Sequence, residues 1–443
     1  MKRRNNDVKR TSITTILSDN LEILIPGAIA LLLHISVLKG SFVYDDRMII
    51  SSDDVVGKRP WKEMLTRDFW GNSMSSNTSH KSYRPLTVLA FRSIHFFFGL
   101  EPFYFHLYNL VLHASCCSCY AILCRKVVAL SSTTASSIDH DNSSECKKDN
   151  HETYLQKAQI LVASILFAVH PIHTEAVASI VGISDIQCAL FYILSILALF
   201  HSIAIDKYLT NEKQIVTTMP QHVINTKLFP YIIAILLACC SSLSKEIGVT
   251  SFGIFISYEI ILIMALHHHS QGSRITLNKI IYSVYFKNPR NMARILVSFA
   301  FPTLITLGHV SLHGEKKIYS WTILENHVSL IDSKLTRILS YMNIHTMYLW
   351  KLIYPFRLSY DYGWKCFDVV ESILDYKNLC TALCYSSILY LSIKSLLQKN
   401  IILFFSMCLL AIPFIPVSNL FFPVSEVDTC ILSIAIFANN IYF

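Results

Sequence analysis

Two adjacent carboxylates, Asp45 and Asp46, stand a few residues beyond the first long apolar run of the chain. Because that run is long enough to cross a bilayer, we expect both at a membrane surface, beside lipid head groups and still in contact with water. A carboxylate in such a place can act as a general base toward a hydroxyl group. The alternative is that this pair simply begins a solvated loop.

A second cluster, His80-Lys-Ser-Tyr-Arg-Pro85, lies at the far end of the same polar loop and supplies basic and hydroxyl groups. Further polar clusters follow at the ends of later apolar runs: His170/His173/Glu175, Lys245-Glu246 and Asp361-Tyr362. Ionisable groups next to a membrane are costly unless they are paired or functional, so their common placement favours a site. Simpler interpretations remain: Arg84 could extend to the head groups, and Lys245-Glu246 could be an interfacial ion pair.

These residue types suit sugar transfer from a lipid phosphate. A carboxylate takes the proton from an acceptor hydroxyl, and in an inverting reaction it lies opposite the leaving group. Arginine stabilises a departing phosphate with two parallel hydrogen bonds. The same inventory is also compatible with ion or lipid transport, although transporters favour ionisable residues at mid-span and internal repeats.

The bulk composition defines the class of protein. Of 443 residues, 53% are hydrophobic and 15% charged, and the mean hydropathy is +0.44, whereas soluble domains carry about 25% charged residues. We therefore predict an all-α polytopic membrane protein. The net charge of +8 is spread over loops and does not indicate nucleic-acid binding.

We predict neither a metal site nor a disulfide framework. The 13 cysteines lie mostly in apolar runs, and no Cys-x-x-Cys pair repeats at metal spacing. His170 and His173 could chelate a metal, but they follow a turn interrupted by proline and have one carboxylate nearby.

The positive-inside rule orients the chain. Its basic tail, 1–15, is predicted in the cytosol, followed by a first span at 16–39, a lumenal loop at 40–103, a multi-span domain at 104–424 and a divergent tail at 425–443. Within the multi-span domain we place spans at about 105–123, 160–169, 186–205, 228–243, 249–266 and 295–312, and a hairpin at 379–393 and 401–417.

Four segments are predicted to lie outside the spans. The run 85–98 is short and contains Arg92 and His95, so we interpret it as an interfacial or re-entrant helix. Residues 131–157 are rich in Ser, Asp and Lys and are expected to form a flexible cytosolic loop. The basic segment 267–294 is placed in the cytosol, and 337–354 is amphipathic. Asn77 begins an N-glycosylation sequon, which is usable only on the lumenal side.

Several motifs resemble those of one enzyme family in the family's order: Phe42-Val-Tyr-Asp-Asp, Asp68-Phe-Trp-Gly71, His80-Lys-Ser-Tyr-Arg-Pro-Leu-Thr-Val-Leu89, Phe105-His106 with Asn109 and His113, His170-Pro-Ile-His-Thr-Glu-Ala-Val-Ala178, Ser244-Lys-Glu-Ile-Gly-Val-Thr250 and Ile412-Pro-Phe-Ile-Pro-Val-Ser-Asn-Leu-Phe421. From about residue 40 to 424 the chain resembles the transmembrane and tetratricopeptide-repeat-containing protein O-mannosyltransferases.

The resemblance implies a GT-C-type glycosyltransferase fold in the endoplasmic reticulum membrane, with a long first lumenal loop. Such enzymes transfer mannose from dolichyl phosphate mannose to Ser or Thr of proteins in the lumen, cadherins among them. It also implies that the base is Asp45, with Asp46 orienting it or contacting the donor. From the chemistry we add Arg84, Lys81 and Lys245 as phosphate ligands, and name the groups that orient donor or acceptor: His80, His173, Glu175 and Glu246.

The sequence departs from the family in two places. After Val424 the chain turns into Ser425-Glu-Val-Asp428 where family members continue toward a long array of repeats, so the resemblance covers the membrane half. In addition, Ile183-Ser184-Asp185 stands where an Arg-Ala-Asp-like segment is usual. The alternative function is therefore a truncated, non-catalytic membrane protein that serves as an anchor or interaction partner.

Overall fold

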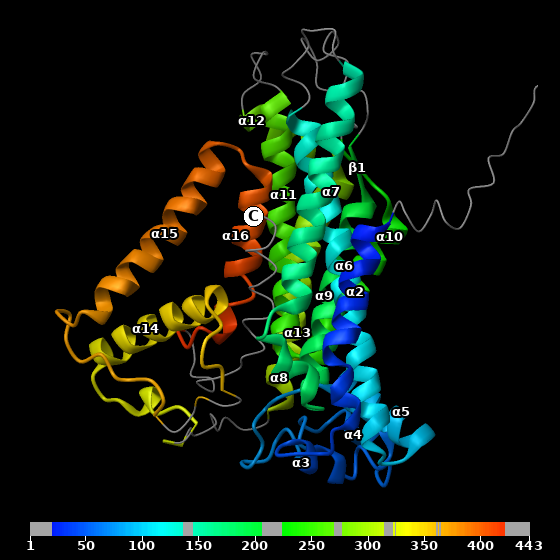
Figure 1. The fold of residues 1–443 in the computed structure, drawn as a ribbon, viewed down its shortest axis with the longest axis vertical. Coiled ribbons are helices and arrows are strands. Elements are labelled where there is room, and N and C mark those ends of the chain that lie inside the picture. The colour runs from blue at the N-terminus through cyan, green and yellow to red at the C-terminus, as the bar shows by residue number, and fades with distance from the viewer. Residues whose placement is uncertain are drawn as a thin grey trace, which may run out of the picture.

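The computed structural model describes residues 20–135, 145–205, 224–269, 277–313, 322–323, 325–359, 362 and 365–420. Asp361, the sequon at Asn142 and the segment 425–428 lie outside the described residues. Long helices run side by side in alternating directions and form one elongated bundle (Figure 1). They are α2 (Leu21–His34, continued by η1, Ile35–Lys39), α6 (Pro102–Ala135), α7 (Glu145–Val169), α9 (Ile183–Ser202), α10 (Leu228–Ser244), α11 (Ser251–His269) and α13 (Pro289–Leu312).

Short elements cap the two ends of this bundle. At the lower end in Figure 1 lie α3 (Asp46–Ser51), α4 (Trp61–Met64), α5 (Pro85–Phe98) and α8 (His173–Ala178). At the upper end are β1 (Ile203–Ile205), paired antiparallel with β2 (Ile224–Thr226), and α12 (Leu277–Ile281), which continues into the π-helical turn η4 (Tyr282–Phe286). The polar loops therefore gather in two separate places.

The last helices form an arm beside the bundle. The arm contains η5 (Val328–Leu330), α14 (Lys334–Ile353), α15 (Lys377–Leu397), α16 (Ile401–Ala411) and η6 (Ile415–Val417). Asn400 fixes the turn between α15 and α16, because its side chain accepts a hydrogen bond from the N–H of Leu403 at 2.9 Å and so caps α16. The predicted hairpin is confirmed.

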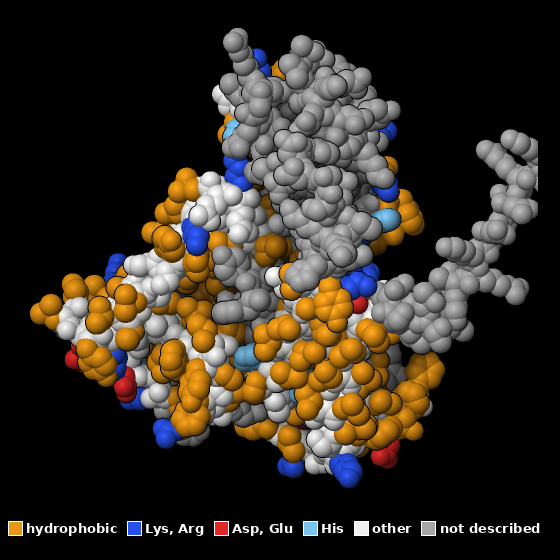
Figure 2. Space-filling model, turned by 45° about the horizontal axis from the view of Figure 1, so that its top comes forward, with side chains coloured by type: hydrophobic (Ala, Val, Ile, Leu, Met, Phe, Trp, Pro, Cys, Tyr) orange, Lys and Arg blue, Asp and Glu red, His pale blue; other side chains and the backbone are white. Residues whose placement is uncertain are grey.

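The predicted multi-span class is confirmed. Among the described residues, six helices are long and apolar enough to cross a membrane: Leu21–Lys39, Pro102–Ser131, Ile183–Ser202, Glu246–His267, Pro289–Ser311 and Lys377–Leu397. Three further predicted spans coincide with shorter apolar helices, Tyr154–Val169, Leu228–Ser244 and Ile401–Val417. Large apolar side chains are exposed along α2, α13 and α15, and Figure 2 shows broad apolar patches with few charged side chains between them.

Two expectations about the loops have clear outcomes. The run 85–98 is a separate short helix, α5, with Pro85 in its first turn and Gly99 ending it in the left-handed region at φ 69°. The flexible loop expected over 131–157 is wrong at both of its ends, where α6 continues to Ala135 and α7 begins at Glu145, while 136–144 lie outside the described residues. The composition of a polar segment favoured a loop, but Glu, Lys and Gln also favour helix once a span has nucleated it.

Candidate active site

Asp46 joins the first loop to the rest of the bundle. Its side chain is fully buried at the start of α3. Carboxylate Oδ1 accepts hydrogen bonds from the backbone N–H groups of Ile180 at 3.0 Å and Val181 at 3.1 Å, and from the Ser179 hydroxyl at 3.3 Å. Oδ2 accepts the N–H of Val43 at 3.3 Å. Since both oxygens are occupied in the interior, Asp46 orients the loop and is not placed to contact a ligand.

Asp45 lies at the edge of the same turn. It is the residue before α3 and is half-buried. Tyr44, directly before it, adopts a left-handed backbone at φ 46°, a conformation that non-glycine residues adopt at a cost and that is common at functional sites. The two acidic neighbours therefore differ in exposure: Asp46 is fully buried, whereas Asp45 is half-buried.

Arg84 lies at the start of α5 and binds two elements of the bundle. Its Nε approaches both carboxylate oxygens of Glu246, at 3.1 and 3.3 Å. Its Nη1 donates to the Ser184 hydroxyl at 3.4 Å, and its guanidinium carbon lies 5.0 Å from the centre of the Phe69 ring. The Arg84 side chain is 15% exposed and that of Glu246 36%. The guanidinium is therefore held by two buried groups, Ser184 and Phe69, and by one carboxylate, that of Glu246, which solvent still reaches.

Lys245 does not pair with its neighbour Glu246. Its Nζ lies 2.7 Å from Oδ1 of Asp185, and the two side chains are 6% and 13% exposed. The alternative interpretation of Lys245-Glu246 as one ion pair is thus replaced by two pairs, Lys245 with Asp185 of α9 and Glu246 with Arg84 beside α5. Lys245 and Asp185 hold α9 against the end of α10, deeper in the protein than Arg84 and Glu246.

These contacts bring three predicted clusters to one end of the bundle. Ser184 connects the two ion pairs, because its hydroxyl oxygen accepts a hydrogen bond from Arg84 and lies 3.0 Å from the Val181 carbonyl oxygen and 3.3 Å from Oδ2 of Asp185, the two acceptors within reach of its single proton. Asp46 binds the backbone of the same segment. The expectation that the acidic pair, Arg84 and the Lys245-Glu246 segment share one face is confirmed by these contacts.

The outer part of the first loop contains Lys81, His80 and Asn77. Lys81 Nζ donates to the carbonyl oxygens of Met74 at 2.6 Å, Ser76 at 2.9 Å and, at 3.5 Å, His313 beyond α13. This ammonium group closes the loop onto the end of α13 and is not directed at the Arg84 pair. His80 and Asn77 are exposed at the surface, and the His80 ring lies 6.3 Å from that of Trp70.

His173 is buried among other histidines. Its ring centre lies 5.3 Å from that of His113, 6.2 Å from that of His170 and 4.6 Å from that of Phe167. Burial, followed by the neighbouring histidines, lowers the pKa of His173 well below its usual value, so the ring is neutral. Glu175, in the first turn of α8, is half-buried. Among the described residues, no three His, Cys, Asp or Glu side chains converge on a metal position.

Two residues of this end were not predicted as site residues. Asp185 was noticed only for its departure from a family pattern, and its pairing with Lys245 spans 60 residues of sequence. Asn109 of α6 is fully buried, and its side-chain nitrogen donates to backbone carbonyl oxygens of α8. For Asn109 the available signal was an amide in the middle of an apolar run, which is costly unless hydrogen-bonded.

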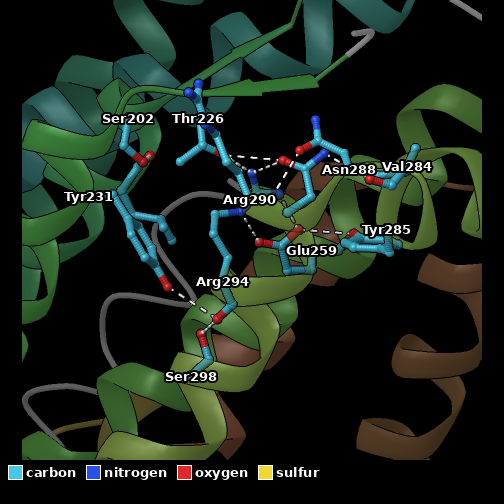
Figure 3. A network of polar contacts seen from close by, with 12 residues as sticks. Ser202, Thr226, Tyr231, Glu259, Val284, Tyr285, Asn288, Arg290, Arg294 and Ser298 are labelled. Carbon is cyan, nitrogen blue, oxygen red and sulfur yellow. Dashed lines mark hydrogen bonds and ion pairs between the residues drawn. The ribbon is translucent and has the colours of Figure 1, made fainter. Parts of the chain in front are cut away.

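A second polar network occupies the opposite end of the bundle (Figure 3). Arg294 of α13 binds Glu259 of α11 with two parallel hydrogen bonds of 2.7 Å each. Its Nη1 reaches Asn291 Oδ1 at 2.7 Å and the hydroxyl of Thr226, and Tyr285 donates to Glu259 at 2.9 Å. Arg294, expected among the charges of a cytosolic loop, is only 1% exposed. It connects α11, α13, η4 and β2.

Taken together, the fold and its polar end define a class: a multi-span α-helical membrane protein with a buried acidic turn and two ion pairs at one end. Comparison with known proteins narrows this class. The family model described as "Protein O-mannosyl-transferase TMTC, DUF1736" matches residues 315–389. No solved structure matches the chain.

Curated relatives match most of the chain. It is 31% identical to Protein O-mannosyl-transferase TMTC4 of Mus musculus, over 91% of this chain and 52% of that protein. It is 30% identical both to TMTC3 of Mus musculus (87% and 38%) and to tmtc2 of Xenopus laevis (84% and 39%). The chain is therefore a homologue of the TMTC protein O-mannosyl-transferases, and it spans about half or less of the length of these relatives. The predicted family is confirmed.

Proposed function

We propose that this chain transfers mannose from dolichyl phosphate mannose to Ser or Thr hydroxyls of proteins in the lumen of the endoplasmic reticulum, cadherins being one candidate class. The observation that carries the proposal is that an acidic turn and an accessible Arg84–Glu246 pair share one end of a membrane bundle. The names of the relatives supply the reaction class. The GT-C-type fold belongs to the same proposal.

In this reaction Asp45 is the base. It takes the proton of the acceptor hydroxyl while that oxygen bonds to the anomeric carbon of mannose. The bond between this carbon and the phosphate oxygen breaks at the same time, and dolichyl phosphate leaves with the bonding electrons. Asp46 has a positioning role in this scheme. Its four accepted hydrogen bonds hold the turn so that Asp45 faces the reacting centre.

Arg84 is the better placed cation for the departing phosphate. Its partner Glu246 is 36% exposed, so a phosphate can exchange for that carboxylate and receive parallel N–H donors. Lys245 is buried and paired with Asp185, so in this proposal it acts on the phosphate only through its positive charge and does not bind it directly. Lys81 is already engaged by three carbonyl oxygens, which favours a role in shaping the loop.

The test is mannosyl transfer from dolichyl phosphate mannose in microsomes. It compares the unaltered chain with Asp45→Asn, with the Asp45→Asn, Asp46→Asn double variant and with Asp53→Asn. Asp53 is a matched control, because it lies in the same loop and pairs with Arg59 at 3.1 Å at the surface. Transfer by the unaltered chain and the control, with loss in both other variants, is the expected result.

Two outcomes would contradict the proposal. Full activity of Asp45→Asn would remove Asp45 as the base. No transfer by the unaltered chain, in membranes where it is inserted and accumulates, would instead favour a non-catalytic anchor or interaction partner.

A further inference from the structure

The turn that holds Asp46 is an interrupted helix. In a continuing helix the N–H of Ile180 would donate to the carbonyl of Ala176, and that of Val181 to the carbonyl of Val177, four residues earlier. Here both N–H groups leave that pattern and donate to Asp46 instead, at 3.0 and 3.1 Å. The last helical bond of α8 is Ser179 N–H to the carbonyl of Glu175, at 2.9 Å.

The carbonyl groups of Ala176 and Val177, which lose these helical bonds, have another hydrogen-bond donor. The side-chain nitrogen of Asn109 lies 2.9 Å from the carbonyl oxygen of Ala176 and 3.0 Å from that of Val177. It also lies 2.8 Å from the carbonyl oxygen of Ser179. Asn109 is fully buried, so no water competes for these positions. The amide of Asn109 therefore takes the place of the two N–H groups that Asp46 has drawn away.

The exchange depends on close approach of the two chain segments. A Cβ atom added at Gly182 would meet the carbonyl oxygen of Ala176 at 2.1 Å, so only glycine fits directly after the turn. A buried carbonyl left without a hydrogen-bond donor destabilises the fold. Without Asn109 the turn would regain its helical bonds and withdraw both N–H groups from Asp46.

We propose that Asn109 is a positioning residue of the acidic turn: by satisfying the carbonyls of α8 it frees the Ile180 and Val181 N–H groups to fix Asp46, and with it Asp45. The assignment of Asp45 as base rests on the proposed function, whereas the hydrogen-bond exchange does not. The inference therefore has one readout that needs no enzymatic activity and one that does.

The first readout is limited trypsin digestion of the purified full chain in detergent, measured as the rate of cleavage after Arg47. This arginine is exposed and lies directly beside Asp46. Asn109→Leu, similar in size but without a donor, is expected to raise this rate at least tenfold. Asn343→Leu makes the same replacement at a buried position of α14 and serves as the control, expected within twofold of the unaltered chain.

A double-mutant cycle separates positioning from general stabilisation. If Asn109 acts through Asp46, the Asn109→Leu, Asp46→Asn double variant is cleaved no faster than Asp46→Asn alone. The inference would be overturned if the increases in cleavage rate of the two single variants multiplied in the double variant, or if the cleavage rate of Asn109→Leu were unchanged. If Asn109→Leu does not accumulate, Asn109→Asp carries the same expectation, because a carboxylate cannot donate to the carbonyls. Accumulation of neither variant would show a role in the whole fold and would also overturn it.

The second readout is the transfer reaction. Asn109→Leu is expected to lower kcat at least tenfold and to leave the KM for dolichyl phosphate mannose within twofold, because the Arg84 pair is untouched. A rise in KM with unchanged kcat would contradict a role in placing Asp45. If the unaltered chain transfers no mannose, the proposed function fails, while the trypsin experiment still decides the role of Asn109.

Discussion

The two ends of the bundle each contain an Arg–Glu pair, and the pairs differ in what surrounds them. Arg294 and Glu259 are 1% and 8% exposed, and Thr226, Asn291 and Tyr285 occupy further hydrogen-bonding positions. Arg84 and Glu246 are 15% and 36% exposed. The same residue types thus form a closed network at one end and an accessible one at the other.

This difference in exposure suits the two pairs to different roles: the Arg294–Glu259 pair to stabilising the bundle and the Arg84–Glu246 pair to binding a ligand. A buried ion pair costs desolvation that only complete hydrogen bonding offsets, so a saturated network has no capacity left for a ligand. An accessible pair contributes little to stability and can exchange one partner for a ligand. Both glutamates lie on the segment formed by η3 (Glu246–Thr250) and α11, with Glu246 at its start and Glu259 near its middle, so one segment contributes to both pairs.

The largest expected effect comes from breaking the closed pair. Arg294→Met leaves the Glu259 carboxylate buried without a counter-charge, and such a loss costs about 3–5 kcal/mol. Thermal unfolding in detergent should show a strongly lowered midpoint or no accumulation. Arg290→Met, on the same helix but exposed, is the control and should unfold as the unaltered chain does. A normal midpoint for Arg294→Met would show that the closed network does not stabilise the bundle.

Arg84→Gln should reverse this pattern. Because the Glu246 carboxylate is 36% exposed, water can hydrate it when Arg84 is lost, so the free energy of unfolding should change by about 1 kcal/mol or less. Mannosyl transfer should fall roughly 100-fold, since a group that stabilises charge in the transition state is lost. The comparison between the ends would break if Arg84→Gln proved as unstable as Arg294→Met while the surviving protein kept full activity.

Low pH should destabilise the end of the bundle that holds the Arg84–Glu246 pair, because His173 lies there on α8. Burial and neighbouring histidines lower its pKa in the folded protein, whereas the unfolded chain binds a proton near pH 6.5. The unfolded state therefore holds more protons below that pH, and stability falls as the pH drops from about 7 to 5. His173→Phe should reduce this dependence in thermal unfolding measured across that range, by the share that His173 contributes. The Arg294 network lacks a histidine among its described contacts, so Arg290→Met should keep the full slope.

The smallest effect is expected at Asn77, on the outer surface of the first loop. Its sequon ends in Ser79, which is buried and accepts the N–H of Lys81 at 3.0 Å. A glycan should therefore be added before the loop folds and should hardly alter stability or transfer. Asn77→Gln is expected to abolish a glycosidase-sensitive gel shift. If the unaltered chain showed no such shift, the end with the Arg84–Glu246 pair would not face the lumen, contrary to the proposed orientation.

The sequence predicted the parts of this molecule that depend on local pattern. Apolar runs located the helices, because burying backbone in a bilayer leaves few other structures. It did not predict the partners of Lys245 and Glu246, which lie 60 and 162 residues away and were chosen by helix packing. Arg294 was misplaced for the same reason: a basic residue near a span end is expected at the surface until a buried carboxylate from another helix is seen.

The partners of Asp46 also determine when this end of the molecule can form during synthesis. Asp46 and Val181 are separated by 135 residues, and Arg84 and Glu246 by 162. At roughly 5–20 residues per second, a ribosome needs about 7–32 s to deliver those partners after the first loop has emerged. For that interval Asp46 has the Val43 N–H but none of its three distant hydrogen-bond donors, so in the proposed orientation the nascent loop is accessible to chaperones and to glycan addition at Asn77. Completion of α9 and α10 then closes that interval.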